Sequence, residues 1–331
     1  MAVSQTNRFL FTRILSNFPK DMTMAFAYGS GVFKQIANKD KDNMIDFIFV
    51  VNDAADWHAQ NLRRNPHHYS SLRHLGAEKI VRIQDEIGAG VYYNTLVRCE
   101  DKLIKYGVVR RDRLIRELID WNTLYLSGRL HKPVSIVQRS SSRTLYNAIR
   151  RNLQSALYAS LLQLPECFTE DELFLKIAGL SYGGDFRMVF GEDKNKVRNI
   201  VSANLDGFRT HYHDMLDNTE HIYWDQKNRT VEQDRSPACL FSHLSCLPKN
   251  LQLSIARLAG GPSHDTGVVL QRIAREKECS DLVARGARNI VRTSSITQSI
   301  KGIFTAGIMK SANYSLQKLA KMWKGGLLLP R

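Results

Sequence analysis

The chain has 331 residues, and 43% of them are apolar, which suits a globular protein with two packed domains and an extension. No apolar run reaches the roughly 18 to 20 residues that cross a bilayer, so the sequence predicts no membrane-spanning helix and any membrane contact should be peripheral. Five cysteines without a Cys-x-x-Cys pair argue against a disulfide framework and a structural zinc site, and they favour a reducing compartment.

The net charge of +15 is concentrated at the C-terminal end of the chain. No acidic residue follows Asp281, whereas the same stretch contains nine lysines and arginines. Such a cluster fits a surface of dense phosphate, which an acidic bilayer and a nucleic acid both offer. At the other end, residues 1–20 contain three basic residues and no acid, which is compatible with a mitochondrial targeting segment. A long removable presequence would cut into the fold, because a strand is predicted to start by Met24.

Short apolar runs separated by turns predict a mixed sheet in the first part of the chain. Strands are expected at residues 25–28 and 45–51, a hairpin at 91–99 and 103–109, and a helix end or loop at 69–76. The apolar spacing then becomes helical. Helices are expected over four segments, residues 112–128, 144–164, 169–180 and 197–212.

Local signals place the ends of these helices. Gly128 and Pro165 should end the first two, and the spacing of Thr169 and Glu172 is that of a capping box that opens the third. Residues 224–237 are polar without clear periodicity and are predicted to form a loop. The sequence therefore predicts an α+β protein of four parts, which are a mixed-sheet domain (1–111), a mostly helical domain (112–222), a loop and helical extension (223–294) and a basic amphipathic tail (295–331).

A Gly-Ser-Gly turn between the first two strands suggests a nucleotide-handling site. Gly29 and Gly31 would let the backbone approach a phosphate, and Ser30 can offer its hydroxyl. A helix after the turn would add its unpaired N–H groups and the positive end of its dipole. A simple turn is the alternative for so short a motif. Asp46 favours the functional interpretation, because on a strand it shares an apolar face with Ile48, where an unpaired carboxylate would be costly.

The turn followed by an acid-bearing strand resembles the nucleotidyltransferase superfamily of polymerase-beta type. Further blocks narrow the resemblance to the family of the mitochondrial translocator assembly and maintenance protein, a mitochondrial phosphatidate cytidylyltransferase or CDP-diacylglycerol synthase. These blocks are Trp-His (57–58), Asn-Pro-His-His-Tyr-Ser (65–70), Gly-Ala-Gly-Val-Tyr-Tyr-Asn (88–94), Leu-Ile-Lys-Tyr-Gly-Val (103–108) and Gly-Asp-Phe-Arg-Met (184–188). The resemblance covers roughly residues 9–323, and the blocks are specific only when taken together.

This resemblance implies a catalytic nucleotidyltransferase domain at residues 1–111, CTP as the donor, phosphatidate as the acceptor and Mg²⁺ as the cofactor. Asp46 would hold the metal, and Ser30 would bind a triphosphate oxygen. The superfamily usually has a second carboxylate two residues further on, where this chain has Ile48. The candidates for that second ligand are Asp42, Asp53, Asp56, Glu100, Asp101 and Asp185. Asp185 is favoured because it lies in a matching block, and an Asp–Arg ion pair within a loop is its structural alternative.

Other polar residues carry weaker predictions. Lys105, in an apolar strand, is expected to contact phosphate rather than to mark an exposed edge, and Arg187 could bind the acceptor phosphate bidentately. Tyr92 and Asn94 alternate on one strand face and would hold base or ribose, with packing as an equal alternative. The histidines 58, 67, 68 and 74 lack zinc-site spacing and are expected in surface or capping positions.

Residues 295–324 are predicted to form an amphipathic helix in the membrane interface, with packing against the protein's own core as the alternative. The expected membrane contacts are Ile300, Phe304, Ile308, Leu319 and Trp323 on the apolar side and Lys301, Lys310, Lys318 and Lys321 toward anionic headgroups. The resemblance places the protein on the matrix side of the mitochondrial inner membrane. Two alternatives remain, namely a nucleotidyltransferase that acts on RNA and a noncatalytic assembly factor for a membrane translocase. A protein that binds RNA is expected to interleave aromatic with basic residues, whereas this basic tail has an aliphatic stripe. A membrane surface is therefore favoured over nucleic acid as its partner.

Overall fold

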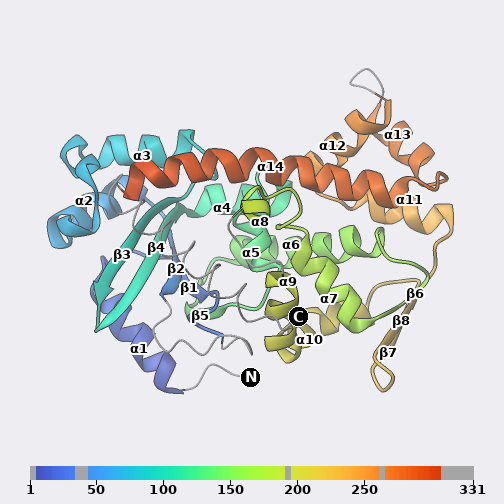
Figure 1. Ribbon diagram of the computed structural model, residues 1–331, viewed down its shortest axis with the longest axis horizontal. Coiled ribbons are helices and arrows are strands. Elements are labelled where there is room, and N and C mark those ends of the chain that lie inside the picture. The colour runs from blue at the N-terminus through green and yellow to red at the C-terminus, as the bar shows by residue number, and fades with distance from the viewer. Residues whose placement is uncertain (1–4, 34–43, 191–194, 261–264, 307–331) are drawn as a thin grey trace, which may run out of the picture.

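The computed structural model describes residues 5–33, 44–190, 195–260 and 265–306. Its first part is built on a five-stranded mixed sheet with the strand order β3-β4-β2-β1-β5 (Figure 1). The strands are β1 (Met24–Tyr28), β2 (Ile45–Val51), β3 (Tyr92–Cys99), β4 (Lys102–Arg110) and β5 (Ser135–Gln138). β2 and β4 pair in parallel and the other neighbours are antiparallel, so the predicted mixed sheet is confirmed.

Alternation along β2 divides the sheet into two faces. Phe47 and Phe49 point to one face, where they pack with Trp57 and with α1 (Gln5–Ser16) and α2 (Ala54–Arg64). Ile48 and Val50 point to the other face, which is covered by α4 (Arg111–Asp120) and α6 (Arg143–Leu161). Because Asp46 alternates with Phe47, it lies on this second face.

Two short 3-10 helices and α3 complete the first part of the chain. They are η1 (Pro66–His68), η2 (Ser71–Leu75) and α3 (Ala77–Glu86). The sheet also takes β5 from beyond residue 111, so the mixed-sheet unit does not end where the sequence suggested. α4 ends at Asp120 rather than at Gly128, because Trp121 takes a left-handed conformation and donates from Nε1 to Asn152.

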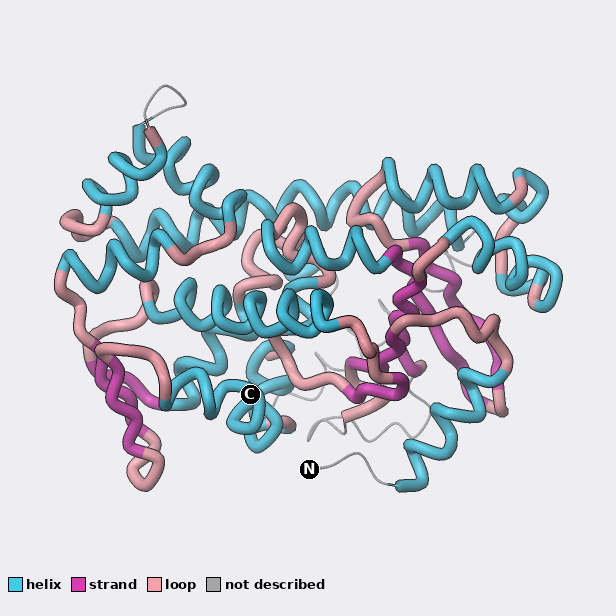
Figure 2. Tube along the Cα trace, turned by 180° about the vertical axis from the view of Figure 1, so that it is seen from behind, coloured by secondary structure: helices cyan, strands magenta, loops and turns pink. Residues whose placement is uncertain are grey.

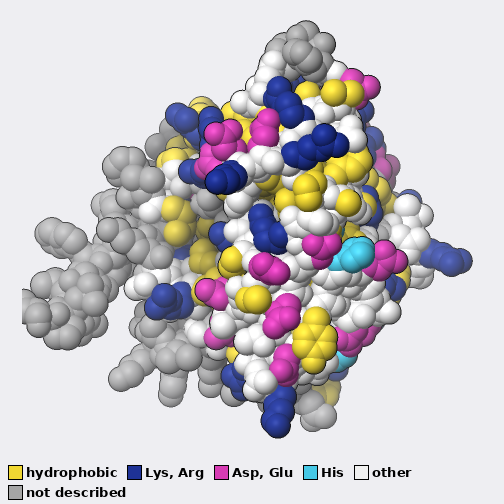
Figure 3. Space-filling view, turned by 90° about the vertical axis from the view of Figure 1, so that its right-hand side faces the viewer, with side chains coloured by type: hydrophobic (Ala, Val, Ile, Leu, Met, Phe, Trp, Pro, Cys, Tyr) yellow, Lys and Arg dark blue, Asp and Glu magenta, His cyan; other side chains and the backbone are white. Residues whose placement is uncertain are grey.

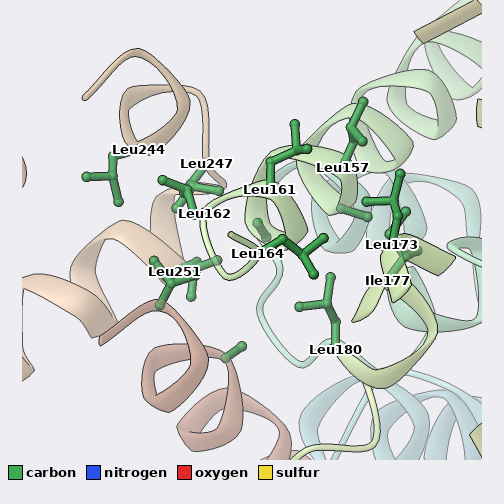
Figure 4. Packing of buried hydrophobic residues seen from close by; sticks show 14 of the residues in the cluster. Leu157, Leu161, Leu162, Leu164, Leu173, Ile177, Leu180, Leu244, Leu247 and Leu251 are labelled. Atoms are coloured by element: carbon green, nitrogen blue, oxygen red, sulfur yellow. The ribbon is translucent and has the colours of Figure 1, made fainter. Parts of the chain in front are cut away.

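The second part of the chain is helical and surrounds a leucine-rich core (Figure 4). α6 contributes to this core. The other helices of this part are α5 (Ser127–Leu130), α7 (Glu170–Gly179), α8 (Arg187–Phe190), α9 (Lys196–Ala203), α10 (Leu205–Asp217), α11 (Pro237–Ser245), α12 (Lys249–Gly260), α13 (Thr266–Ile273) and α14 (Cys279–Ala306). The capping box of Thr169 and Glu172 is present at the start of α7, while the helix predicted over 197–212 is divided at Asn204 into α9 and α10.

A second, three-stranded sheet contradicts the predicted loop at 224–237. β6 (Cys167–Thr169), β8 (Thr230–Gln233) and β7 (Ile222–Asp225) pair antiparallel in this order. Only two side chains of β8 are buried, so its alternation is hard to see among charged neighbours. Figure 2 shows the two sheets at opposite ends of the molecule with helices between them.

α14 extends along the molecule and connects its two parts (Figure 1). It packs on α12 in the helical part and on β3 at the edge of the five-stranded sheet. The predicted boundary at 294/295 falls inside this helix, so residues 295–306 continue an element of the fold rather than start a separate tail. Within the described residues, no helix is long and apolar enough to cross a membrane.

Candidate active site

The Gly29–Gly31 turn lies directly beside the acid-bearing strand. Gly29 has φ +83°, and its carbonyl accepts hydrogen bonds from the N–H groups of Val32 and Phe33. A Cβ on Gly31 would lie 2.5 Å from the carbonyl oxygen of Met44, so only glycine lets the turn approach the start of β2 this closely. Residues 30–33 form a turn, and the helix predicted to follow it falls outside the described residues.

Asp46 faces Lys105 across the parallel strands β2 and β4. The two residues are register partners, and Lys105 Nζ lies 3.6 Å from Asp46 Oδ1. Asp46 Oδ1 is buried and accepts no hydrogen bond from the described residues. A Cβ on Gly29 would be 3.3 Å from Asp46 Oδ2, which shows that the glycine turn adjoins this carboxylate. The structure thus brings together the three features that the sequence singled out, namely the turn, the acid and the lysine.

These residues form one wall of a cavity of about 370 Å³ between the sheet and the helical part. The opposite wall comes from α5 and the residues beside it, from the segment after α7, from α9 and from α14. The polar and aromatic residues on that wall are Thr123, Tyr125, Arg129, Lys132, Ser181, Tyr182, Asp185, Arg187, Lys196, Asn204, Ser294 and Ser295. A carboxylate on one side therefore faces several cations on the other, which is the arrangement that an anionic substrate with a metal requires.

Arg129 and Lys132 belong to this wall, and the sequence analysis did not identify them. The Arg129 guanidinium lies 3.9 Å from the centroid of the Tyr125 ring and 5.2 Å from that of Tyr28. Lys132 Nζ donates to Ser181 Oγ at 2.9 Å and to the carbonyl of Gly128. No local signal marked the two cations, because Ser127, Gly128 and His131 interrupt any apolar pattern around them.

The cations shift the pKa values of their neighbours. Burial alone would raise the pKa of Tyr125, but the charges of Arg129, Lys105 and Arg187 outweigh it and lower that pKa to about 8. Burial, together with the charges of Arg129 and Lys196, lowers the pKa of Lys132 to about 7. Both changes have the direction expected for a site with excess positive charge, and an anion would relieve that excess.

Asp185 and Arg187 lie at the cavity as an ion pair. Arg187 donates from Nε to both carboxylate oxygens of Asp185 and from Nη2 to Oδ2 at 2.5 Å. This is the structural alternative that the sequence left open for Asp185. The pairing occupies the Nε and Nη2 edge of the guanidinium, so a contact of Arg187 with the acceptor phosphate would have to use Nη1 and the second N–H of Nη2. Gly184 holds the segment against α14, because a Cβ there would lie 2.5 Å from the Arg288 carbonyl.

Of the other acids proposed as second metal ligands, the four that the structure describes lie elsewhere. Asp53 caps α2 by accepting from Ala55 and Asp56, and Glu100 pairs with Arg13. Asp56 accepts from Gln60, Asp101 is exposed in the β3–β4 turn, and Asp42 lies outside the described residues. Among the residues that the structure describes, no three His, Cys, Asp or Glu side chains come close enough to share a metal ion.

The donor set nevertheless fits Mg²⁺ held mainly by substrate. Mg²⁺ usually retains several waters and takes one or two protein carboxylates together with phosphate oxygens. Asp46 offers one such carboxylate, since its buried Oδ1 has no hydrogen-bond donor among the described residues. Asp185 could serve only if it gave up its hydrogen bonds from Arg187.

Tyr92 and Asn94 do not lie at the cavity, and the packing interpretation accounts for them. They are on the opposite face of the sheet, where Tyr92 packs against Tyr69 and Asn94 donates to the hydroxyl of Tyr106. Their neighbour Tyr93 lies on the site face, and Lys105 Nζ is 4.5 Å from the centroid of its ring. The packing alternative therefore holds for Tyr92 and Asn94, and Tyr93 is the residue of this pair of neighbours that lies on the face of Asp46.

Two of the four histidines also differ from expectation, since they are buried in a polar network behind the sheet. His58 Nε2 lies 3.0 Å from Gln84 Oε1, and its Nδ1 lies 2.8 Å from the Tyr69 hydroxyl. Because an amide oxygen only accepts, Nε2 donates and Nδ1 accepts from Tyr69. His68 bonds the Tyr106 hydroxyl at 3.0 Å. His67 and His74 are exposed, as expected.

The predicted membrane-binding residues divide into three groups. Ile300 and Phe304 are exposed on α14, at 50% and 63%. Lys301 was expected to face headgroups, but it is 2% exposed and donates to the carbonyls of Gln84 and Ile87. That assignment is wrong, because the lysine docks α14 onto the end of α3. The remaining six lie outside the described residues, and they are Ile308, Lys310, Lys318, Leu319, Lys321 and Trp323.

Comparison of the sequence with known proteins identifies the family of this chain. The chain is 48% identical over 326 residues to the protein named phosphatidate cytidylyltransferase, mitochondrial, of Danio rerio, which covers 97% of this chain and 96% of that protein. It is 47% identical over 307 residues to the human protein of the same name, which covers 92% of this chain and 68% of the human protein. The identity to the Caenorhabditis briggsae protein is 36%, with 95% and 98% covered.

Among solved structures, a nucleotidyltransferase-like protein from Exiguobacterium sibiricum matches 90% of this chain and 77% of its own at 10% identity. The TM-score is 0.24, which is too low to carry an argument about the fold. The family evidence is much stronger, because residues 11–321 match the family described as phosphatidate cytidylyltransferase, mitochondrial. Since this match and the identities to the relatives both extend over nearly the whole chain, the chain belongs to the mitochondrial phosphatidate cytidylyltransferase family.

Proposed function

We propose that this chain transfers the cytidylyl group of CTP to phosphatidate and releases CDP-diacylglycerol and pyrophosphate. The names of its relatives supply the reaction, and one observation on this chain carries the proposal. A single cavity joins the glycine turn, Asp46 and Lys105 on the sheet side to Arg129, Lys132 and Arg187 on the helical side. That cavity offers one wall for a triphosphate and another for a second phosphate.

The sheet side would bind the nucleotide. The open backbone at Gly29 and the hydroxyl of Ser30 would contact triphosphate oxygens, and Lys105 would balance their charge. In the reaction, a phosphate oxygen of phosphatidate attacks the α-phosphorus of CTP. The bond from that phosphorus to the bridging oxygen breaks, and pyrophosphate leaves with its electron pair. Little covalent chemistry is required of the protein, so positioning and charge stabilisation dominate catalysis.

Asp46 is the residue that would hold Mg²⁺, and Asp185 is a second candidate only after release from Arg187. The ion would screen the triphosphate and stabilise the charge that develops on the leaving oxygens. The alignment of the acceptor would still depend on the cations of the helical wall. Lys105, already close to Asp46, would then contact phosphate.

The relatives are named as mitochondrial proteins, and we extend that location to this chain, on the matrix side of the inner membrane as a peripheral protein. Exposed Ile300 and Phe304 at the end of α14 support contact with a bilayer, as does the basic sequence that follows them. There the product would supply the synthesis of phosphatidylglycerol and cardiolipin. The end of the molecule formed by the helical part carries interspersed acidic and basic side chains (Figure 3), unlike the single-sign surface that suits RNA.

The direct test incubates the purified chain with labelled CTP, Mg²⁺ and liposomes that contain phosphatidate. We expect a labelled liponucleotide that requires both phosphatidate and the metal. Parallel reactions with ATP, GTP and UTP test the choice of donor, and equal use of all four would reject the cytidylyl assignment. Labelling of an RNA oligonucleotide instead of lipid would favour the RNA enzyme. No transfer to either acceptor by a folded chain would favour a noncatalytic assembly factor.

A further inference from the structure

The helical wall of the cavity contains a buried lysine without a carboxylate partner. Lys132 is 9% exposed and lines the cavity just after α5. Its Nζ donates to Ser181 Oγ and to the Gly128 carbonyl, and it lies 5.1 Å from the centroid of the Tyr182 ring. No carboxylate pairs with it among the described residues. A buried ammonium in such a place is costly unless an anion accompanies it.

The surroundings of Lys132 are held in place by close backbone packing. A Cβ on Gly128 would lie 2.2 Å from Ser181 Cβ, so α5 and the segment after α7 touch directly at the point where Lys132 joins them. Arg129, on the same short helix, is fixed by the Tyr125 and Tyr28 rings and by its bond to the Tyr125 carbonyl. Its buried Nε has no hydrogen-bond partner among the described residues. The two cations are therefore preorganised, and each retains capacity for a ligand.

We propose that Arg129 and Lys132 form the seat for the phosphomonoester of the lipid acceptor, separate from the triphosphate contacts at Ser30, Asp46 and Lys105. This inference rests on the proposed function, because it assigns the second phosphate of that reaction to the helical wall. Arg187 is the weaker candidate, since its guanidinium already binds Asp185 through Nε and Nη2. A phosphomonoester carries close to two negative charges near pH 7, which suits a site with two cations.

Binding of the phosphomonoester at Arg129 and Lys132 should be accompanied by uptake of a proton. The charged and titratable groups that line the cavity with Lys132 are Arg129 on α5, Lys196 on α9, Tyr125, and Tyr182, Asp185 and Arg187 after α7, and His131 adjoins Lys132 in the chain. Burial, with the charges of Arg129 and Lys196, lowers the pKa of Lys132 to about 7. A neutral amine has two N–H groups, which Ser181 and Gly128 already use, and a proton adds the third for the phosphate. The ligand's negative charge favours that proton, so at pH 8 Lys132 should take up a proton from solvent when the phosphate binds.

The test uses the full chain and monomeric dioctanoyl phosphatidate, titrated by calorimetry at pH 8 without CTP. Two buffers with different ionisation enthalpies give the number of protons taken up. We expect Lys132→Met to bind the lipid at least tenfold more weakly and to lose the proton uptake, while CTP binding stays within twofold of the parent. Lys132→Arg should retain lipid binding but lose the proton uptake, because arginine stays charged. Lys227→Met, in the exposed turn between β7 and β8, should match the parent in every titration.

Two results would overturn this assignment. The first is a folded Lys132→Met chain that binds phosphatidate as tightly as the parent. The second is a loss of CTP binding with lipid binding intact, which would place Lys132 at the triphosphate. If Lys132→Met does not fold, the Lys132→Arg chain decides, because unchanged proton uptake in it contradicts the role of the amine. Failure of the proposed function is separate, since it would appear as a parent chain that binds phosphatidate but forms no liponucleotide.

Discussion

Lys105 Nζ lies 3.6 Å from Asp46 Oδ1, and the two residues are register partners on the parallel strands β2 and β4. Parallel pairing fixes this relationship, because both side chains leave the sheet on the same face. The lysine partly balances the acid before any substrate is present. When a metal ion and triphosphate bind, Asp46 would coordinate the metal and Lys105 would contact phosphate. The pairing of β2 with β4 therefore places both residues for the proposed chemistry.

Asp46→Asn should reduce turnover by at least about 100-fold while the fold is retained, because the change removes the charge for the metal at nearly constant volume. The measurement is liponucleotide formation at saturating CTP, with circular dichroism to establish folding. Asp21→Asn changes an exposed acid before β1 and should behave as the parent. Near-parental turnover in a folded Asp46→Asn chain would remove Asp46 from the site.

Ser30→Ala should raise the KM for CTP by about 5- to 30-fold, since one hydrogen bond to a charged oxygen is lost, worth about 1 to 2 kcal/mol. The KM for phosphatidate should stay the same, because Ser30 lies on the sheet wall of the cavity. Ser245→Ala, at the exposed end of α11, is the matched control. Unchanged constants for CTP would leave Ser30 as a turn residue only.

Acid should destabilise this protein through its buried histidines. Burial lowers the pKa of His58 and of His243 to about 4 and that of His131 to about 3. Each folded-state pKa is below the unfolded value near 6.5, so the unfolded chain binds more protons between about pH 6.5 and 4 and the free energy of unfolding falls as the pH falls. Between pH 7.5 and 5.5, His58 alone should account for a loss of about 1 kcal/mol.

Urea unfolding at several pH values measures this slope. His74→Gln replaces an exposed histidine and should leave the slope unchanged, whereas His58→Gln should reduce it even if the chain is less stable overall. A free energy of unfolding that stays constant or rises from pH 7.5 to 5.5 would contradict the burial of neutral histidines.

Local sequence patterns predicted β1 to β4, the capping box at Thr169 and the placement of Asp46 beside the glycine turn, whereas the short strands β5 to β8 were not predicted. Tyr92 and Asn94 were predicted at the site but lie on the opposite face, because alternation shows that neighbours face opposite ways, but not which face holds the site. Arg129 and Lys132 were missed because long-range packing brings the short helix α5 against Ser181, and no local pattern reports such a contact. Lys301 was misassigned because a helical stripe of lysines gives no sign of which one docks on a neighbouring carbonyl.

The structure changes how membrane binding should be tested. A chain that ends at Ser294 would lose Gln298, which accepts from the N–H of Ala89, and Lys301, which binds the end of α3. Each lost bond leaves a buried polar group unsatisfied, at about 1 to 3 kcal/mol. Weaker vesicle binding by a chain that ends at Ser294 would therefore not distinguish unfolding from loss of the anchor.

A chain that ends at Ala306 keeps these contacts, and we expect it to retain the parent's melting temperature while binding anionic vesicles much more weakly. Removal of residues 307–331 takes away four lysines and one arginine without any acid, and each such charge contributes about 1 kcal/mol near an anionic surface.

Two further variants test the described part of α14 in the full-length chain. The double change Ile300→Ser and Phe304→Ser should weaken vesicle binding more at high salt than at low salt, because apolar contact dominates when charges are screened. Lys301→Met should instead lower the melting temperature, because its role is internal. Flotation with cardiolipin-containing vesicles at low and high salt measures the binding, and equal flotation of the Ala306 chain and the parent would show that the anchor lies elsewhere.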